Sequence, residues 1–311
     1  MSCNNQLKEN YGLFIGGEWR PASDGTTYQS TNPANGEVLT QCAQATKEDV
    51  DAAVAAAWKA FPEWKKTTKE ERAAILDKIA DRVEENQEWL AKVETMDNGK
   101  PIRETMAIDV PYSIRHFRYY ASLIRTDEGV ASILDGGMMS LVLREPIGVV
   151  GQIVPWNFPF LMAAWKLAPA IAAGDCIVFK PSSTTSLSML VFTELIQDLL
   201  PAGVLNLITG AGGKSGQYLL DHPDLCKLAF TGSTEIGKNV ALAAANKRIE
   251  NILKKNTLPL ADAVDPALLT EKEEKDLYEA IRTLEPKLEA DYKAGRYEDE
   301  LRSLAPLKAP V

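Results

Sequence analysis

The chain contains 311 residues, 45% of them hydrophobic, which is enough for one large or two medium-sized domains with well-filled cores. Its formal net charge of −9 and its pI of about 5.0 argue against a broad nucleic-acid surface and a basic membrane patch. With four widely spaced cysteines and two histidines, neither a disulfide framework nor a metal site is expected. No stretch approaches roughly 18 consecutive apolar residues, and the N-terminus has no apolar leader, so we expect a cytoplasmic protein without membrane contact.

The first part of the chain combines short strands with helices that carry clear start signals. Residues 1–45 are polar and contain turn-forming glycine, proline and asparagine, which indicates an arm followed by short strands. Thr46 with Asp49, and Thr68 with Glu71, form the capping pattern that begins many helices, and apolar residues at helical spacing follow each pair. We therefore predict two amphipathic helices whose apolar faces pack into a core.

A third amphipathic stretch follows at about 102–124, and the pattern changes from residue 140 onward. Short runs rich in Val, Ile and Leu end at Gly or Pro and alternate with helical stretches. This alternation is typical of βαβ units and of a parallel sheet buried on both faces. The predicted fold class is α/β, with a Rossmann-like parallel sheet flanked by helices and an antiparallel ribbon at about 128–145.

Small and polar residues follow the predicted strands at their carboxyl ends, where parallel sheets bind ligands. These segments are Pro155-Trp156-Asn157, Lys180-Pro181-Ser182, Gly210-Ala211-Gly212 and Thr231-Gly232-Ser233. Lys180 can bind ribose hydroxyls or a phosphate, the Asn157 amide can stabilise an oxyanion, and Gly232 lets a ligand approach the backbone. Taken singly, each is better explained by a solvated side chain or a capped turn. Their shared position predicts a site.

The order of short motifs resembles that of the NAD(P)-dependent aldehyde dehydrogenase superfamily over roughly residues 10–243. The motifs that carry the resemblance are FIGGEW (14–19), TNPANGEV (31–38), PIGVVGQIVPWNFP (146–159), LAPAIAAGD (167–175), FKPS (179–182), PAGVLNLITG (201–210) and FTGSTEIGK (230–238). The resemblance implies an oxidoreductase that converts a small-molecule aldehyde to a carboxylic acid with NAD or NADP as cofactor. In this family the cofactor lies over a parallel sheet.

The resemblance also implies roles for individual residues. Asn157 would be an oxyanion-hole donor, and Lys180 would hold the adenosine ribose. The nicotinamide side would be lined by Ile153, Pro155 and Trp156. The adenine end would be flanked by Gly212 and Gly216, and the pyrophosphate would meet Gly232, Ser233 and Ile236.

Ser183 is a departure from many family members, which have a glutamate at this position, three residues after the lysine. A carboxylate there holds the ribose and repels a 2′-phosphate, whereas a hydroxyl does not repel it. NADP is therefore an alternative to NAD for this chain.

The two groups that perform the chemistry in the family are not found in the sequence. No ELGG segment with the general-base glutamate occurs, and no cysteine follows Cys226 to serve as the nucleophile. Cys176 is expected inside a core strand, as a small buried apolar residue. We therefore expect a truncated chain that binds the cofactor at most, and no turnover by this chain alone.

The helix after residue 233 changes its apolar face near residue 243. Ile236, Val240 and Ala243 share one face, but the next apolar residues, Ala245, Ile249 and Ile252, lie roughly half a turn away. From about 241 to 311 the sequence resembles the C-terminal helical region of the bacterial glycine–tRNA synthetase β subunit. This indicates a chimaera of an incomplete cofactor-binding domain, 1–243, and an all-α tail, 244–311.

Three further hypotheses follow from this organisation. The tail would make at most a weak tRNA contact, because its positive and negative charges nearly balance. Alternatively, the joined segments have no evolved joint function. Finally, a sheet that lacks neighbouring strands exposes edges, so we expect self-association.

Overall fold

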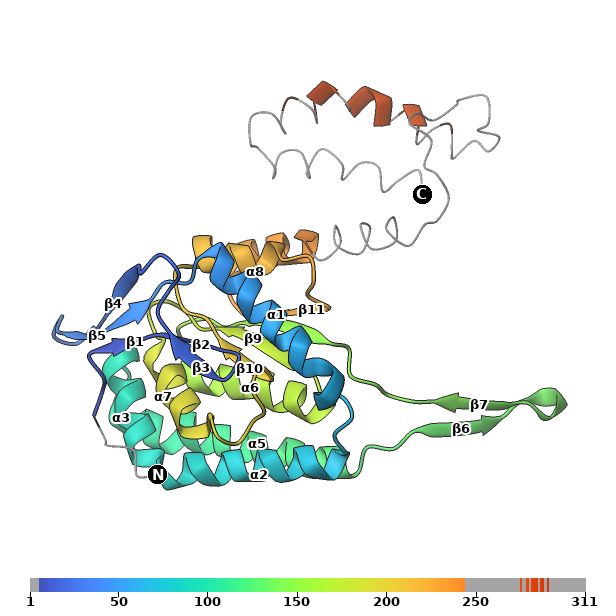
Figure 1. Ribbon diagram of the computed structural model, residues 1–311, viewed down its shortest axis with the longest axis horizontal. Coiled ribbons are helices and arrows are strands. Elements are labelled where there is room, and N and C mark those ends of the chain that lie inside the picture. Colours follow the sequence, from blue (N-terminus) through green and yellow to red (C-terminus); the bar gives the residue numbers. More distant parts are fainter. Residues whose placement is uncertain are drawn as a thin grey trace. The chain divides into compact units, whose positions relative to one another are not determined.

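The computed structural model describes residues 6–243, together with 275, 278–279, 281–284, 286–287 and 290 (Figure 1). The chain divides into two compact units, Met1–Asn251 and Ile252–Val311. The described residues of the second unit are helical. The rest of the predicted tail, including the second apolar set of the helix after residue 233, lies outside the described residues.

A six-stranded sheet forms the centre of the first unit (Figure 1). Four neighbouring strands are parallel and two more continue the sheet in antiparallel orientation. In spatial order they are β11 (Lys227–Phe230), β8 (Val149–Ile153), β9 (Cys176–Lys180), β10 (Leu205–Leu207), β2 (Leu13–Ile15) and β3 (Glu18–Arg20). The predicted α/β fold with a parallel sheet is confirmed. The addition of β2 and β3 to that sheet was not foreseen.

Helices cover both faces of this sheet. Helix α1 packs on one face, α6 packs on the other, and α2 and α5 form a further layer against α6. The helical segments are α1 (Lys47–Trp64), α2 (Lys69–Glu85), α3 (Gln87–Asn98), α4 (Ile102–Glu104), η1 (Thr105–Asp109), α5 (Val110–Arg125), α6 (Pro159–Ala173), α7 (Leu187–Ile196), η3 (Gly212–Gly216) and α8 (Gln217–Asp221). Residues 234–243 are also helical.

The predicted helix starts are confirmed. Thr46 and Asp49 begin α1 with a reciprocal capping box, and Thr68 and Glu71 begin α2 in the same way. The third predicted helix is interrupted: α4 and a π-helical turn, η1, precede α5. Pro111 lies in the first turn of α5 and has no backbone N–H, so a regular α-helical hydrogen bond cannot form there.

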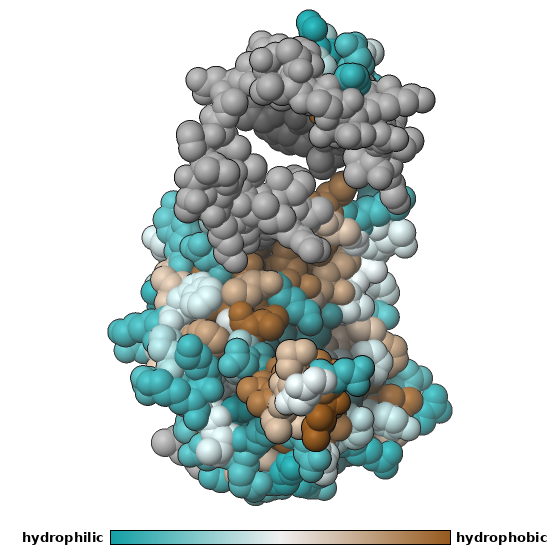
Figure 2. Space-filling view, turned by 90° about the vertical axis from the view of Figure 1, so that its right-hand side faces the viewer, coloured by the Kyte–Doolittle hydropathy of each residue, from teal (hydrophilic) through white to brown (hydrophobic). Residues whose placement is uncertain are grey.

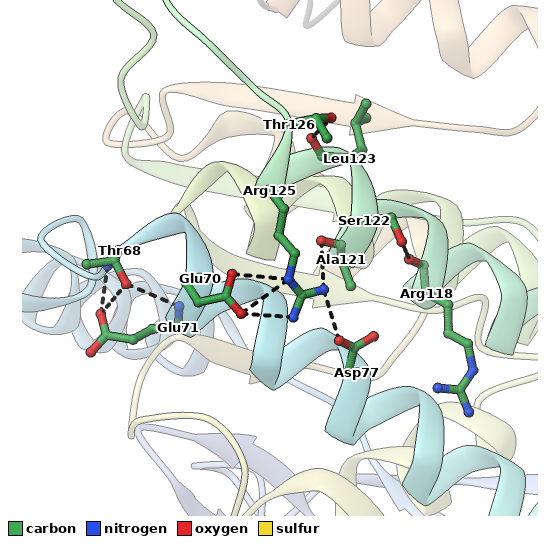
Figure 3. A network of polar contacts seen from close by, with 10 residues as sticks. All are labelled: Thr68, Glu70, Glu71, Asp77, Arg118, Ala121, Ser122, Leu123, Arg125 and Thr126. Carbon is green, nitrogen blue, oxygen red and sulfur yellow. Dashed lines mark hydrogen bonds and ion pairs between the residues drawn. The ribbon is translucent and has the colours of Figure 1, made fainter.

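The core lies between the sheet and its helices. All residues of β9, including Cys176, are buried, as a central strand covered on both faces requires. On the outside, Arg125 of α5 binds Glu70 and Asp77 of α2, at 3.1 and 3.0 Å (Figure 3). Arg118 contacts Asp81 and Glu84 of the same helix. These exposed ion pairs join two helices that also pack together through their apolar faces.

Two smaller sheets complete the first unit. One contains β1 (Asn10–Tyr11), β5 (Val38–Ala43) and β4 (Thr27–Thr31). The other is an antiparallel ribbon of β6 (Val130–Ile133) and β7 (Met139–Val142), joined through η2 (Asp135–Gly137), within the range expected from the sequence.

The ribbon projects from the body of the unit, and its side chains are mostly exposed (Figure 1). Figure 2 views the side on which the ribbon projects and shows hydrophobic residues gathered on this face. In the part of the chain that the structure describes, no helix has both the length and the apolarity to cross a membrane.

Candidate functional site

The carboxyl ends of β8, β9, β10 and β11 lie side by side at one edge of the sheet. Ile153 pairs with Lys180 on one side and with Phe230 on the other. Two further backbone bonds continue these pairings beyond the strands: Val154 donates to the Lys180 carbonyl and Thr231 donates to the Ile153 carbonyl. The segments that follow the four strands are therefore brought together at this edge, which we call the carboxyl edge.

Lys180 lies at the centre of the carboxyl edge and is only 2% exposed. Its Nζ donates to the Pro181 carbonyl at 2.9 Å, and burial lowers the pKa of its ammonium group to about 8. The stem of Lys180 crosses Gly216, where an added Cβ would lie 3.4 Å from Cε. The stem of the lysine therefore lies along the backbone of η3, at a distance where an added Cβ would make an ordinary van der Waals contact.

Asn157 lies in the loop between β8 and α6, and its side chain is exposed. It makes no hydrogen bond to any residue that the structure describes, so its amide is available to a ligand. The preceding residue, Trp156, is 62% exposed, and its carbonyl accepts a hydrogen bond from Asn98 Nδ2 at 2.6 Å. Pro155 and Ile153 lie partly exposed at the base of this loop.

Ser233 caps the helix over residues 234–243. Its Oγ accepts from the Ile236 N–H at 3.4 Å, and its carbonyl accepts from the Gly237 N–H at 2.9 Å. Gly232, just before the cap, lies against the ring of Phe230, where an added Cβ would be only 2.4 Å from a ring carbon. Gly232, Ser233 and Ile236 are all exposed, so the N-terminus of this helix is open to solvent.

The π-helical turn η3 supplies the segment after β10. Gly212 is exposed and Gly216 is buried beneath Lys180. Gly210 precedes the turn with a φ of 132°, and an added Cβ would lie 2.2 Å from Ser215 Oγ. Only glycine fits there, which fixes how the chain leaves β10.

A cleft of about 640 Å³ opens beside the carboxyl edge. Two of the predicted cofactor residues, Trp156 and Ser183, line it together with Ala211, the residue before η3. Residues of β4 and the end of α3 form the opposite wall. Ser183 is partly exposed, between Ser182 and Thr184, whose hydroxyls lie 2.9 Å apart. This side of the cleft therefore presents hydroxyl groups and no carboxylate among residues 182–184.

None of the cysteines in the described residues is placed for nucleophilic chemistry at the carboxyl edge. Cys42 and Cys176 are buried, and burial raises the pKa of each thiol to about 12. Cys226 is exposed but precedes β11, where its N–H binds the Val149 carbonyl at the start of β8. It therefore lies at the amino ends of the strands, the edge opposite to Lys180.

This arrangement of strand ends can be compared with known proteins. Residues 19–268 match the aldehyde dehydrogenase family. The chain belongs to this family. The match extends beyond residue 243, the end that the sequence motifs predict for the aldehyde dehydrogenase-like segment.

Individual aldehyde dehydrogenases are similar over the same part of the chain. Aldehyde dehydrogenase B of Escherichia coli (strain K12) is 50% identical over 264 residues, which are 84% of this chain and 52% of that protein. An aldehyde dehydrogenase of Vibrio cholerae serotype O1 is 50% identical over 248 residues, 80% of this chain and 49% of that protein. The NAD⁺ complex of aldehyde dehydrogenase from Bacillus cereus superposes with a TM-score of 0.75 at 40% identity, over 77% of this chain and 50% of that one. This aldehyde dehydrogenase family member thus spans about half the length of its relatives.

The sequence of this aldehyde dehydrogenase family member did not lead us to predict that the end of α3 contributes to the site. Asp97 and Asn98 line the cleft, and Asn98 binds the loop of Asn157. The signal was the Asp97-Asn98-Gly99 turn, with polar residues and a glycine at a helix end, but nothing local indicates what such a turn contacts.

Proposed function

We propose that this chain binds NAD(P) at the carboxyl edge of its sheet. The observation that carries the proposal is Lys180, an ammonium group 2% exposed at the end of a central strand, with no carboxylate partner among the described residues. Burying a lysine without a counter-charge is unfavourable. A side chain kept in this state next to an open cleft is typical of a ligand site.

The groups at the carboxyl edge fit a dinucleotide. Lys180 Nζ has hydrogens beyond the one given to Pro181, and Ser183 adds a hydroxyl, so both suit the hydroxyls of the adenosine ribose. The exposed N-terminus of the helix over 234–243 suits the pyrophosphate, because its N–H groups point outward and favour negative charge. When bound, the nicotinamide supplies the hydride acceptor for aldehyde oxidation.

The remaining residues take the roles that the sequence resemblance implies. Ile153, Pro155 and Trp156 would line the nicotinamide, and Asn157 would donate to the oxygen of a bound aldehyde. The adenine would lie between Gly212 and Gly216, and Gly232, Ser233 and Ile236 would meet the pyrophosphate. One of these residues is supported by the absence of a side chain: Gly232 accommodates the ring of Phe230.

NADP is accepted as well as NAD, because the residue at position 183 is a serine. Ser183→Glu places a carboxylate beside the 2′-position of the ribose, so the affinity for NADP should fall by at least about tenfold while that for NAD changes by less than about threefold. Titration of both cofactors, followed by tryptophan fluorescence, measures the ratio. An equal loss of both affinities, or no change in either, would contradict this assignment. Ser182→Glu is the matched control for an added negative charge.

The relatives that match this chain are aldehyde dehydrogenases, so the reaction that this cofactor site would serve is aldehyde oxidation. The reaction needs a thiolate to attack the aldehyde, and no described cysteine lies at the carboxyl edge as a reactive thiol. We therefore expect the chain alone to bind the cofactor beside Asn157, without turnover by a cysteine of the described residues.

A turnover assay separates cofactor binding from catalysis. The purified chain is mixed with NAD or NADP and a panel of aldehydes, and reduced nicotinamide is followed by its absorbance. We expect saturable cofactor binding without an increase in absorbance. An increase that Asn157→Ala abolishes would show that the chain carries its own nucleophile and would overturn the second half of the proposal.

Two features of the sequence support further contacts. The resemblance of residues 241–311 to a tRNA synthetase region favours a weak tRNA contact, and a gel shift with tRNA at low salt tests it; no shift would remove this candidate. The exposed apolar ribbon of β6 and β7 favours self-association.

A further inference from the structure

The loop that carries Asn157 and the first turn of α6 are contacted at every second residue by the C-terminal end of α3 or by Lys100, which follows it. Asn98 Nδ2 donates to the Trp156 carbonyl at 2.6 Å. Two residues on, the Phe158 ring lies under Lys100, whose Nζ is 3.3 Å from the ring centroid. Another two residues on, the Phe160 N–H donates to a carboxylate oxygen of Glu94 at 3.3 Å.

The groups that make these contacts are themselves fixed. Lys100 forms an ion pair with Asp109 at 2.7 Å, and the Asp109 side chain is only 1% exposed. Gly99, between Asn98 and Lys100, adopts a φ of 85°, which ends α3 and turns the chain toward the loop. An added Cβ on Gly99 would lie 2.8 Å from the Pro33 side chain, so a residue with a side chain does not fit at position 99.

Glu94 takes the place of a local cap on α6. No side chain at the start of α6 caps its first turn, although this turn lies directly after the loop. Glu94 comes from another helix and is 1% exposed, and burial raises the pKa of its carboxyl to about 7. Ser188 interacts with this carboxyl and partly offsets the rise in its pKa, but the second oxygen makes no regular hydrogen bond to a described residue. Burying a carboxyl group costs free energy, so packing alone does not explain Glu94 at this position. Its hydrogen bond to the Phe160 N–H holds the start of α6.

We propose that Glu94 and Asn98 at the C-terminal end of α3, together with Lys100 just after it, form the positioning platform for Asn157. The carbonyl before Asn157 and the ring after it are both held, so the backbone of Asn157 is fixed while its side chain stays exposed. None of the three residues is assigned contact with the cofactor; they act through the loop. This inference rests on the proposed cofactor site, because it concerns the placement of one of its residues.

The experiment compares two asparagines that make the same kind of bond at opposite ends of α3. Asn98→Asp and Asn98→Ala remove the donor to the Trp156 carbonyl, and Ala does so without adding charge. Asn86→Asp is the matched control, since Asn86 Nδ2 donates to the Arg82 carbonyl at 2.8 Å, before α3 begins. The six tryptophans are labelled with 5-fluorotryptophan, and the resonance of Trp156 is assigned with Trp156→Phe.

Both Asn98 variants should shift or broaden the Trp156 fluorine resonance, leave the other tryptophan resonances unchanged, and weaken NAD and NADP binding by about fivefold. Asn86→Asp should change neither. An unchanged Trp156 resonance in both Asn98 variants, or equal effects in the control, would overturn the proposal. If no variant binds cofactor, the proposed function fails, but the Trp156 resonance of the cofactor-free chain still decides whether Asn98 positions the loop.

Discussion

At the level of single residues, the buried ammonium group of Lys180 lowers the free energy of unfolding of the chain. Burial holds the pKa of its ammonium group near 8, below the usual value of about 10.4. Because the unfolded chain binds this proton more tightly, the free energy of unfolding should rise as the pH increases from about 8 to about 10.5. At pH 7 the charge is present in both states, and its burial destabilises the fold.

Lys180→Met should therefore raise the free energy of unfolding at pH 7 by about 1 to 3 kcal/mol, since methionine follows the same path over Gly216 without a charge. Urea denaturation at pH 7 measures the change. Gln152→Met, which replaces a buried neutral polar group on β8, is the comparison for a change of polarity without a change of charge. A loss of stability in Lys180→Met would mean that the ammonium group is well solvated.

Glu94 gives a pH dependence of the opposite sign. Burial raises the pKa of its carboxyl to about 7, so the folded chain binds this proton more tightly than the unfolded chain, whose value is about 4.3. The contribution to stability is fully present below about pH 4.3 and is lost as the pH rises through about 7. Glu94→Gln, which stays neutral, should remove a decrease of up to about 3 kcal/mol in the free energy of unfolding across this window. Denaturation at a series of pH values checks it, and an unchanged pH profile would contradict it.

At the scale of elements, Gly232 and Gly237 form a matched pair at the start of the helix over 234–243. A Cβ on Gly232 would meet the Phe230 ring at 2.4 Å, whereas on Gly237 it would lie at an ordinary 3.7 Å. Gly232→Ala should displace the ring and reduce cofactor affinity by at least about tenfold, because the N-terminus of the helix moves with it.

Gly237→Ala should retain cofactor affinity and raise the free energy of unfolding by up to about 1 kcal/mol, because alanine has the higher helix propensity. Calorimetry and denaturation of both variants test this, and equal effects would argue against a special role for Gly232.

Elements with a local signal were predictable from the sequence, and elements that depend on distant contacts were not. The capping boxes at Thr46 and Thr68 are local, and so is the alternation of strands and helices after residue 140. The pairing of β2 with β10 joins segments about 190 residues apart, and no local pattern records it. Lys180 packs against Gly216 of another βα unit, and the contact of Asn98 with Trp156 depends on where α3 ends. The positions of the site residues were therefore predictable, but their surroundings were not.

At the scale of the whole molecule, the ribbon of β6 and β7 is the main exposed apolar feature of the described residues. Ile133, Met139 and Leu141 share one of its faces and are 82%, 68% and 60% exposed. Their replacement by serine or threonine should shift the chain toward the monomer, because the apolar area available for association falls. The free energy of unfolding of a monomer should change little. Sedimentation velocity across a concentration series measures the shift, and an unchanged distribution of species would exclude this face of the ribbon as the contact.

We propose that half the length of an aldehyde dehydrogenase is enough to form a cofactor site around Lys180. Calorimetric titration of NAD and NADP into the wild-type chain and into Lys180→Met tests it most directly. We expect saturable binding to the wild type and loss of binding in the variant, which should remain folded and become more stable. No binding to the wild type, or equal binding to both chains, would contradict it.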